Sequence, residues 1–476
     1  LPTARYGAVM DFDLIVLGLG PGGDEVAEKV AASGQSVLGI DQHLVGGECP
    51  YYGCIPSKMI IRGSDVLAES RRVNQIAGRA SDEPDLAPVA KRIRDEATDN
   101  WDDRVAVERF EGNGGTFIRG AGRLAGRDAA GRLVVEVNGE THTARNVVVA
   151  TGTAPAIPPI DGLADLPRGV DELVWTNREI VKAETAPASM VVIGGGAVGC
   201  ELAQGFARFG TRVTVIEGAP HLLMPEEPEA GKVVADVFVR EGITVHQGVG
   251  VQSVARGGDG VVVTLAGGST ATAEKVLVAA GRRPNLSDIG LETVDLDPKA
   301  RSLDVDEHMH VVAGAGAPVD GLHAVGDITG HGAFTHVAVW QARVLIAHLL
   351  GRDEPYGGYH GLAWATFTDP EVGRVGMSEK QARDKGLSVR IGTQEFAANS
   401  RGWIHGPGND GFVKLVEDAD RGVLVGATVV GPYGGELLGL LTLAVHAEVP
   451  VRTLATMHYA FPTLHRAVLE AVGALA

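Results

Sequence analysis

The chain of 476 residues is too long for one ordinary hydrophobic core and predicts two to four domains. Its net charge of −18 argues against a nucleic-acid or anionic-membrane surface, and because it has no run of about 18 apolar residues we expect no membrane-spanning helix. Three cysteines are too few for a secreted disulfide framework, which indicates a cytoplasmic protein.

The first predicted element is a buried strand that leads into a glycine turn. The apolar run 14–17 is followed by Gly18, Gly20 and Gly23, a helical stretch over 25–32 and a second apolar run that ends at Asp41. Glycines at this spacing allow the backbone to approach a pyrophosphate at a helix N-terminus, and the acid can bond ribose hydroxyls. This pattern predicts a dinucleotide-binding unit.

Two cysteines follow in the stretch GGECPYYGCIPSK, residues 46–58. Four residues separate Cys49 from Cys54, so the thiols can meet across one helical turn. A helix N-terminus and a nearby lysine lower the pKa of a thiol. The spacing is compatible with electron transfer, with a zinc site and with a passive disulfide. Zinc needs two more ligands, and the third cysteine, Cys200, is predicted to be an inert buried thiol.

The glycine pattern recurs about 176 residues later. Gly194, Gly196 and Gly199 follow the apolar run 191–193, and Glu217 ends the next predicted strand. A carboxylate there repels a 2′-phosphate, which favours NADH over NADPH, although His221 and Lys232 keep NADPH possible.

Further strand signals lie around the second unit. The runs 147–155 and 276–285 each end in glycine and a turn with proline, and predict crossings between two nucleotide domains. A strand ending at Gly326–Asp327 precedes a helical run over 333–351. Asp327 is interpreted as a contact to a polyol chain or as a helix N-cap.

Together these motifs resemble the flavoprotein disulfide reductases, the pyridine nucleotide-disulfide oxidoreductases of the lipoamide dehydrogenase and mercuric reductase type. The resemblance covers essentially the whole chain, including the C-terminal stretch that opens FTDPEVGRVG, residues 367–376. It implies that the first unit binds FAD, the second binds NAD(P)H, and a third domain forms a homodimer with shared active sites.

The resemblance also implies roles for the opening cysteine stretch. Cys54 would be the thiolate against the flavin and Cys49 the thiol that meets the substrate, with Tyr51 and Tyr52 along its approach. Lys58 would approach the flavin, with Glu201 as its partner. The remaining implied cofactor contacts are Gly47, Gly120, Thr151, Gly152, Val198, Val251, Gly281, Asp327 and Thr335.

The C-terminus departs from the family pattern. Most members carry a His-Pro pair with a glutamate four residues after the proline, and this dyad moves the proton of a dithiol substrate. Here Phe461 precedes Pro462, and Arg466 stands at the glutamate position. Phenylalanine cannot titrate, so it cannot act as acid or base. Arginine is better suited to an anion contact than to proton transfer.

Three neighbouring residues are candidates to replace the dyad. His465 follows Phe461 by four positions, one turn if the segment is helical, and His458 and Tyr459 precede it. For each of the three, an ordinary polar position at a subunit interface is the favoured alternative.

The predicted fold class is α/β, with two Rossmann-like domains for FAD and NAD(P) and a C-terminal α+β dimerisation domain. The expected segments are 1–158 for FAD, 159–287 for NAD(P), 288–353 for the central FAD segment and 354–476 for dimerisation. Residues 72–110 are interpreted as a surface helix pair near the dimer contact. Asn138–Gly139 is expected to be the turn of a β-hairpin.

The sequence therefore predicts an FAD-dependent NAD(P)H oxidoreductase with a redox-active Cys49–Cys54 pair and a non-standard acceptor: a small disulfide, a quinone or a metal ion. One alternative is a lipoamide dehydrogenase with a relocated acid-base. A mercuric reductase-like enzyme is a second, although no cysteine pair occurs near the C-terminus. The alternative from another class is a non-catalytic flavin-binding subunit.

Overall fold

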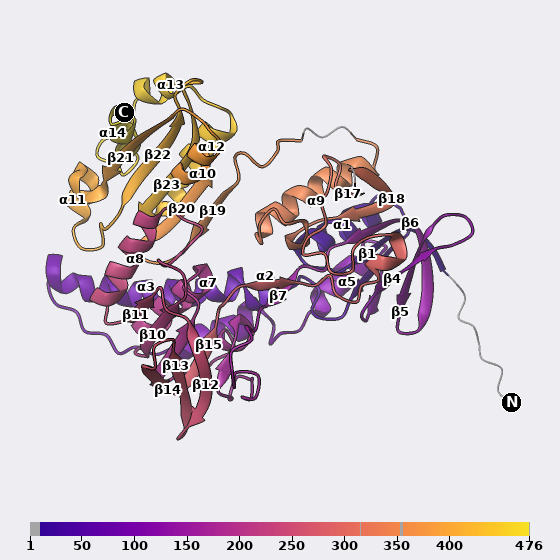
Figure 1. Ribbon diagram of the computed structural model, residues 1–476, viewed down its shortest axis with the longest axis horizontal. Helices are drawn as coiled ribbons and strands as arrows, with labels where there is room; N and C mark the ends of the chain where they lie inside the picture. Colours follow the sequence, from indigo (N-terminus) through magenta and orange to yellow (C-terminus); the bar gives the residue numbers. More distant parts are fainter. Residues whose placement is uncertain (1–9, 315, 353–355, 476) are drawn as a thin grey trace. The chain divides into compact units, whose positions relative to one another are not determined.

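The computed structural model describes residues 10–314, 316–352 and 356–475, and the chain divides into two compact units (Figure 1). Unit 1 consists of Leu1–Pro56, Arg92–Pro155 and Arg282–Gly357. Unit 2 consists of Ser57–Lys91, Ala156–Gly281 and Gly358–Ala476. Relative to the expected FAD segments, the main difference is that residues 57–91 belong to unit 2.

Unit 1 is built on an eight-stranded sheet whose central strands are parallel. The spatial order is β17-β18-β6-β1-β2-β3, with the antiparallel strands β5 and β4 attached beside β6. The strands are β1 (Met10–Leu17), β2 (Val37–Asp41), β3 (Thr116–Arg119), β4 (Arg123–Arg127), β5 (Leu133–Val137), β6 (Glu140–Val149), β17 (His310–Ala313) and β18 (Ala317–Ala324). This sheet is the predicted Rossmann-like arrangement, with the carboxyl ends of β1 and β2 at one edge.

Both faces of this sheet are buried, as expected of a parallel sheet. Leu14 and Val16 of β1 enter one core with α1 (Pro21–Ala32), α5 (Arg104–Gly112) and α9 (Thr335–Leu349). Ile15 and Leu17 enter the opposite core with β4, β5 and residues 286–303. The short elements of this unit are α2 (Glu48–Tyr52), η1 (Ile93–Ala97), η2 (Leu291–Val294), η3 (Asp327–Thr329) and the two-stranded ribbon β7 (Thr153–Pro155) with β16 (Arg282–Pro284).

The predicted hairpin is confirmed. β5 and β6 pair in antiparallel register from Val137 opposite Glu140, and the turn between them has φ of 53° at Asn138 and 81° at Gly139. Positive φ at both positions is the geometry for which Asn-Gly is favoured.

Unit 2 contains a second parallel sheet, in the order β11-β10-β9-β15-β8. Its strands are β8 (Val174–Trp175), β9 (Ser189–Ile193), β10 (Arg212–Glu217), β11 (Thr244–Gln247) and β15 (Lys275–Val278). An antiparallel sheet of β12 (Val251–Gly257), β13 (Gly260–Leu265) and β14 (Thr270–Ala273) accompanies it. The helices of this part are α3 (Cys54–Ile76), α4 (Ala87–Arg92), α6 (Asn177–Ile180), α7 (Ala197–Arg208) and α8 (Pro228–Arg240). The first residues of α3 belong to the first segment of unit 1, and α4 ends at the residue that begins its second segment.

The C-terminal part of unit 2 is an antiparallel five-stranded sheet with helices, in the order β19-β20-β23-β22-β21. Its strands are β19 (Ala363–Thr366), β20 (Glu371–Gly376), β21 (Val389–Glu395), β22 (Phe412–Asp418) and β23 (Val423–Gly431). Its helices are α10 (Glu379–Asp384), η4 (Phe396–Ala398), α11 (Ser400–His405), α12 (Gly434–His446), α13 (Val451–Thr456) and α14 (Arg466–Gly473). The observed mixture of strands and helices matches the predicted α+β domain.

The predicted surface helix pair over residues 72–110 is wrong in part. α3 already occupies the chain to Ile76, and α5 buries Phe110 completely against α1 in the core of unit 1. Arg109 on the same helix bonds Asp24 and Glu28 of α1. No helix among the described residues is long and apolar enough to cross a membrane.

Candidate active site

The first glycine motif forms the predicted turn between β1 and α1. Gly18 has φ of 93°, and a Cβ there would lie 2.5 Å from the Ala150 carbonyl oxygen. A Cβ on Gly23 would lie 2.0 Å from the Gly18 carbonyl oxygen. At Gly20, the N-cap of α1, a Cβ would meet no described atom within 4 Å. The outer glycines are therefore required by the fold, whereas the middle one borders open space at a helix N-terminus, which suits a pyrophosphate.

Asp41 lies at the end of β2 beside this turn. Its carboxylate accepts hydrogen bonds from the Leu19 amide at 2.7 Å and the His43 amide at 2.7 Å. Burial raises the pKa of this carboxyl, against the lowering effect of both amides. Gly120 donates its amide to the Asp41 carbonyl, and a Cβ on Gly47 would lie 2.8 Å from the Gly20 Cα. These two predicted contacts thus lie beside the glycine turn.

The second glycine motif repeats the same geometry in unit 2. A Cβ on Gly194 would lie 2.4 Å from the Ala279 carbonyl oxygen, and one on Gly199 would lie 2.0 Å from the Gly194 carbonyl oxygen. A Cβ on Gly196, the N-cap of α7, again meets no described atom within 4 Å. Glu217, at the end of β10, accepts the Gly195 amide and the Ala219 amide, both at 2.6 Å. The residues fit a second dinucleotide.

The two residues that kept NADPH possible are engaged elsewhere. The His221 ring Nδ1 bonds the Leu222 carbonyl at 2.8 Å, and the Lys232 ammonium pairs with Asp236 at 2.6 Å. Of the other predicted contacts in unit 2, Val198 is an exposed residue on α7, Val251 begins β12, and Gly281 has φ of 106°. The cofactor contacts of these three residues stay predictions.

Asp327 is not the N-cap of a long helix, so that interpretation is wrong. It begins the short helix η3, and the N-cap of α9 is Phe334. Its carboxylate accepts the Thr153 hydroxyl at 2.5 Å, and the Arg282 guanidinium lies 4.0 Å away. Thr151 and Gly152 are held through reciprocal bonds with Asn285, and Gly152 has φ of 62°. These groups lie at the ribbon β7–β16, where the chain leaves and re-enters unit 1.

Cys49 and Cys54 come together as predicted. Cys49 lies on α2, Cys54 is the first residue of α3, and both are thiols in this structure. A hydrogen bond with the Cys54 side chain, followed by burial, raises the pKa of the Cys49 thiol. The Cys54 sulfur lies 3.6 Å from the Thr335 hydroxyl at the start of α9. The Cys49 thiol can therefore donate a hydrogen bond to the Cys54 sulfur.

Lys58 and Glu201 form the predicted ion pair, with 2.7 Å between Nζ and Oε2. The other oxygen, Oε1, accepts the Phe367 amide at 2.8 Å. The Lys58 ammonium also lies 4.8 Å from the centre of the Phe367 ring. Sequence reasoning missed Phe367. The signal for it is the FTDP stretch, residues 367–370.

The third cysteine and the two tyrosines between the thiols are also described. Cys200 is buried and donates its thiol to the Gly195 carbonyl at 3.3 Å, and burial raises its pKa, as an inert thiol requires. Tyr51 is 7% exposed, and its carbonyl accepts the Trp101 indole N–H at 3.0 Å. Its place along the approach to Cys49 stays a prediction. Tyr52 is half-buried.

The C-terminal candidates do not share a helix with Phe461. α14 begins at Arg466, with His465 as its N-cap, so the proposed one-turn relation between Phe461 and His465 is wrong. Phe461 is 69% exposed, and the Arg466 guanidinium lies 5.3 Å from its ring centre. The Tyr459 hydroxyl donates to the Leu454 carbonyl at 3.1 Å, and burial raises its pKa. The side chains of His458 and His465 are exposed.

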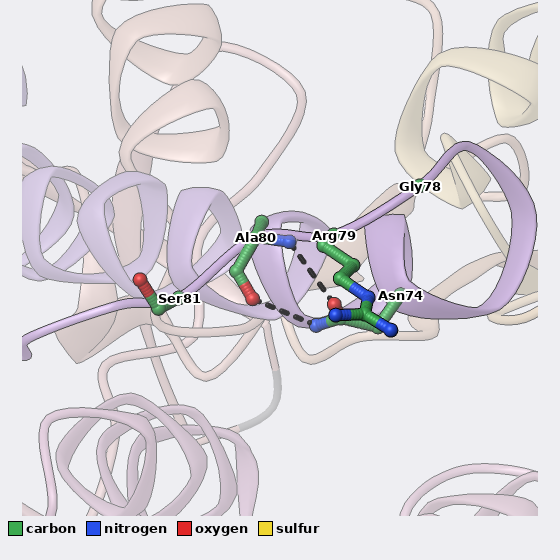
Figure 2. A pocket seen from close by; sticks show the side chains of 5 residues that line it. All are labelled: Asn74, Gly78, Arg79, Ala80 and Ser81. Atoms are coloured by element: carbon green, nitrogen blue, oxygen red, sulfur yellow. Dashed lines mark hydrogen bonds between the residues drawn. The ribbon is translucent and has the colours of Figure 1, made fainter.

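Two cavities of unit 2 are lined by residues other than the thiol pair and the glycine turns. One, of about 510 Å³, is lined by Asn74, Gly78, Arg79, Ala80 and Ser81 (Figure 2). The Asn74 amide closes this loop through two bonds to Ala80, each 3.0 Å long. A second cavity in unit 2, of about 570 Å³, borders Arg208 and Asp369.

Comparison with known proteins gives a consistent result. The family described as pyridine nucleotide-disulphide oxidoreductase matches residues 12–342, and its dimerisation domain matches residues 362–472. A dihydrolipoyl dehydrogenase from Thermus scotoductus is 32% identical over 98% of this chain and 97% of its own. One from Haloferax volcanii is 31% identical over 96% and 95%.

Solved structures agree in fold. LpdA from Mycobacterium tuberculosis has a TM-score of 0.82 and 28% identity, covering 98% of this chain and 99% of its own. The HOCl-induced flavoprotein disulfide reductase RclA from Escherichia coli has a TM-score of 0.81 over 97% and 99% of the two chains. At 22% identity, RclA supports the fold alone.

Proposed function

Because the chain belongs to the pyridine nucleotide-disulphide oxidoreductases, we propose that it oxidises NADH and reduces an acceptor that needs no His-Glu proton relay. The family match makes it an oxidoreductase that uses FAD and NAD(H). The match of residues 362–472 to the dimerisation domain supports a homodimer. The acceptor and the roles of individual residues are the proposal, and a cytoplasmic location stays a prediction.

The two glycine turns would hold the two dinucleotides. In unit 1 the open space beside Gly20 at the start of α1, with Asp41 for ribose and Asp327 for a polyol chain, would take FAD. In unit 2 the space beside Gly196, with Glu217 for ribose, would take NADH. FAD, when bound, supplies the two-electron redox chemistry that connects a nicotinamide to a thiol pair.

The thiols have different tasks in this proposal. Cys54 begins α3, and the partial positive charge at a helix N-terminus favours the thiolate form. Cys49, whose pKa is raised first by its hydrogen bond with Cys54 and then by burial, is the thiol that meets the acceptor. Thr335 lies 3.6 Å from the Cys54 sulfur and can donate a hydrogen bond to it when the thiolate forms.

The observation that carries the choice of acceptor is the contact between Arg466 and Phe461. A ring and a guanidinium, 5.3 Å apart, occupy the two positions where the family keeps histidine and glutamate. Neither group transfers protons near neutral pH. A general acid-base typically contributes about 10²–10⁴-fold, so lipoamide or glutathione disulfide is expected to turn over slowly. A quinone or metal ion avoids this requirement.

The second candidate is dihydrolipoyl dehydrogenase activity with a relocated acid-base, which the names of the curated relatives favour. Tyr459 is the weaker substitute because its hydroxyl proton already bonds the Leu454 carbonyl. His458 and His465 are exposed and remain candidates for that role. A mercuric reductase-like activity and a non-catalytic subunit are the remaining alternatives.

A panel of acceptors tests the proposal. The purified holoenzyme is assayed with NADH and with NADPH against lipoamide, glutathione disulfide, a benzoquinone and Hg²⁺. We expect NADH to be the better donor, and turnover with the quinone or Hg²⁺ to exceed lipoamide turnover by about 100-fold. Lipoamide turnover equal to that of the best acceptor would instead establish the relocated acid-base. A protein that NADH does not bleach would be a binding subunit.

A further inference from the structure

A series of ion pairs within unit 2 extends from Lys58 to the buried Arg208 and on to Asp369, and we call this series the ion-pair ladder. On α3, Lys58, Asp65 and Arg72 are seven residues apart, which places them on one helical face. On α7, Glu201 and Arg208 have the same spacing. Lys58 pairs with Glu201 at 2.7 Å and Asp65 pairs with Arg208 at 2.7 Å, so the two helices are joined at matching steps.

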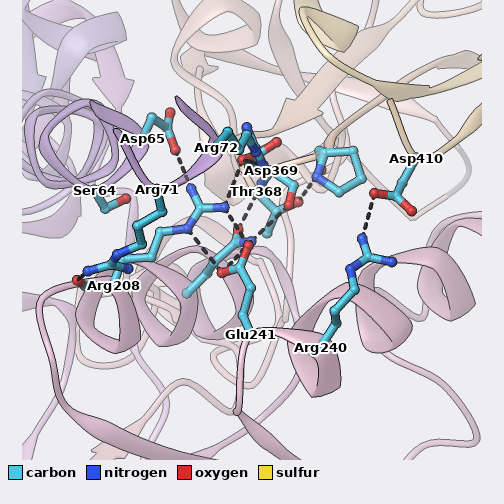
Figure 3. Close-up of polar contacts among 12 residues, drawn as sticks. Ser64, Asp65, Arg71, Arg72, Arg208, Arg240, Glu241, Thr368, Asp369 and Asp410 are labelled. Carbon is cyan, nitrogen blue, oxygen red and sulfur yellow. Dashed lines mark hydrogen bonds and ion pairs between the residues drawn. The ribbon is translucent and has the colours of Figure 1, made fainter. Parts of the chain in front are cut away.

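The third step of the ladder reaches the segment 367–369 that follows β19. Arg72 bonds the Asp369 carboxylate at 2.6 Å, and Arg208 bonds the same oxygen at 2.7 Å (Figure 3). Asp369 therefore receives one guanidinium from α3 and another from α7. Figure 3 shows the Arg208 guanidinium enclosed by Asp65, Glu241 and Asp369.

α7 holds this segment at three points along one face. Glu201 accepts the Phe367 amide at 2.8 Å, and Gln204 exchanges two bonds of 2.8 Å with the Asp369 backbone. Arg208 supplies the third point through the Asp369 carboxylate. The spacing i, i+3, i+7 keeps the three side chains on the same side of the helix.

The charged groups of the ladder are paired and largely buried, which fixes their positions. Arg208 is 2% exposed, and its guanidinium is bonded by three carboxylates. Burial alone would raise the pKa of the Asp369 carboxyl, but the Arg208 and Arg72 guanidinium groups outweigh burial and lower it. Removing one member of such a buried set leaves an uncompensated charge.

We propose that Asp369 is a positioning residue that fixes the Lys58–Glu201 pair through Phe367. Phe367 touches both members of that pair, by its amide to Glu201 and by its ring to Lys58, and Asp369 anchors the same segment two residues later. The inference rests on the proposed function, in which Cys54 is the thiolate, and on the place of Lys58 near the flavin that the family resemblance implies. Loosening Asp369 would let the Phe367 segment move and carry the pair with it.

The test is the pH dependence of the long-wavelength charge-transfer absorbance in holoenzyme reduced by one equivalent of NADH. This absorbance reports the Cys54 thiolate without any acceptor turnover. We expect Asp369→Asn to raise the pH midpoint of the band by about half a unit, and Lys58→Met to raise it by about one unit. Because both changes act through one pair, Asp369→Asn adds no further shift in the Lys58→Met background.

Two further variants complete the test. Arg240→Gln breaks the Arg240–Asp410 pair at the cavity that also borders Asp369. This pair includes neither Phe367 nor Asp369, so the midpoint should stay unchanged. If Asp369→Asn does not fold, Arg72→Gln takes its place. The Arg72 side chain is 16% exposed, and its loss removes one of the two guanidinium groups from Asp369. The pH midpoint should then rise by a smaller amount.

The outcomes separate the two claims. A wild-type enzyme without the band overturns the proposed function, and the positioning role with it. A wild-type band with unchanged midpoints in Asp369→Asn and Arg72→Gln overturns the positioning role alone. Additive shifts in the double variant overturn it as well, since they show that Asp369 acts independently of Lys58.

Discussion

Phe461 and Arg466 contact each other directly, with the guanidinium 5.3 Å from the ring centre. The ring is 69% exposed and precedes a proline, and the arginine is the first residue of α14. Cation–π contacts of this kind hold an arginine without supplying a proton acceptor. The contact therefore joins two side chains that do not serve as general acid or base, which is the basis of the proposed choice of acceptor.

Restoring the family pattern should restore turnover of a dithiol substrate. We expect Phe461→His combined with Arg466→Glu to raise NADH-dependent lipoamide reduction by about 10- to 100-fold, since a general acid-base contributes about 10²–10⁴-fold when well placed. Steady-state rates with lipoamide measure this. Phe461→His alone is the matched control and should gain less, because Arg466 cannot orient the new imidazole. An unchanged rate in the double variant would show that the acceptor pocket excludes lipoamide for other reasons.

The glycines of the first turn should separate folding from cofactor binding. Gly20→Ala places its Cβ in open space, so the protein should fold but lose FAD affinity by about 10-fold or more. Gly23→Ala places its Cβ 2.0 Å from a carbonyl oxygen and should destabilise unit 1 by roughly 1–3 kcal/mol or more. Flavin content and urea unfolding of the purified variants distinguish the two effects. Full flavin content in Gly20→Ala would contradict the assignment of that space to FAD.

Glu217 should set the preference for NADH. Two backbone amides fix its carboxylate at the end of β10, where it would bond ribose hydroxyls and repel a 2′-phosphate. Glu217→Ser is expected to reduce the NADH-to-NADPH ratio of kcat/KM by about 10- to 100-fold, the value of one or two charge-assisted hydrogen bonds. Lys232→Gln is the control, since that ammonium pairs with Asp236, and it should leave the ratio unchanged. A ratio that survives Glu217→Ser would assign the preference to other residues.

His323 should make unit 1 sensitive to acid. Burial, followed by repulsion from His310 and His348, lowers its pKa from 6.5 to about 3, while Asp306 opposes this. The unfolded chain binds a proton as pH falls through 6.5, but the folded chain does not. Stability is therefore lost between about pH 6.5 and pH 3, at up to roughly 1.4 kcal/mol per pH unit.

Replacing His323 with glutamine tests this slope. The side chain is 1% exposed and its Nε2 lies 3.3 Å from the Asn146 Oδ1, so a glutamine amide can keep that bond. Urea unfolding of the holoenzyme is monitored through the release of flavin at pH values from 7.5 to 5. The free energy of unfolding should depend less on pH in His323→Gln than in the wild-type protein. His308 is exposed, so His308→Gln is the control and should keep the wild-type dependence of the unfolding free energy on pH. Equal slopes in His323→Gln and wild type would contradict the assignment.

The sequence predicts the local elements of this fold well because they depend on local chemistry. The glycine turns and the Asn138–Gly139 hairpin follow from residue spacing and positive-φ requirements, and both are present. The Cys49–Cys54 and Lys58–Glu201 pairings are also formed. The hairpin and the turns need no knowledge of distant segments.

The contacts that the sequence did not reveal are long-range. Phe367 meets Glu201 across 166 residues, and Asp369 meets Arg72 across 297. A seven-residue spacing of charges on α3 is visible in the sequence, but its partners on other elements are not. The burial of Phe110 was missed for the same reason, since the charged residues around it are typical of a surface helix.

The most direct test of the central claim is a titration of the holoenzyme with NADH under anaerobic conditions. If Cys49 and Cys54 receive the electrons, one equivalent produces the long-wavelength thiolate-to-flavin absorbance, and Cys54→Ser abolishes it. If NADH bleaches the flavin without that absorbance in the wild-type enzyme, the thiol pair does not carry the electrons and the account is wrong.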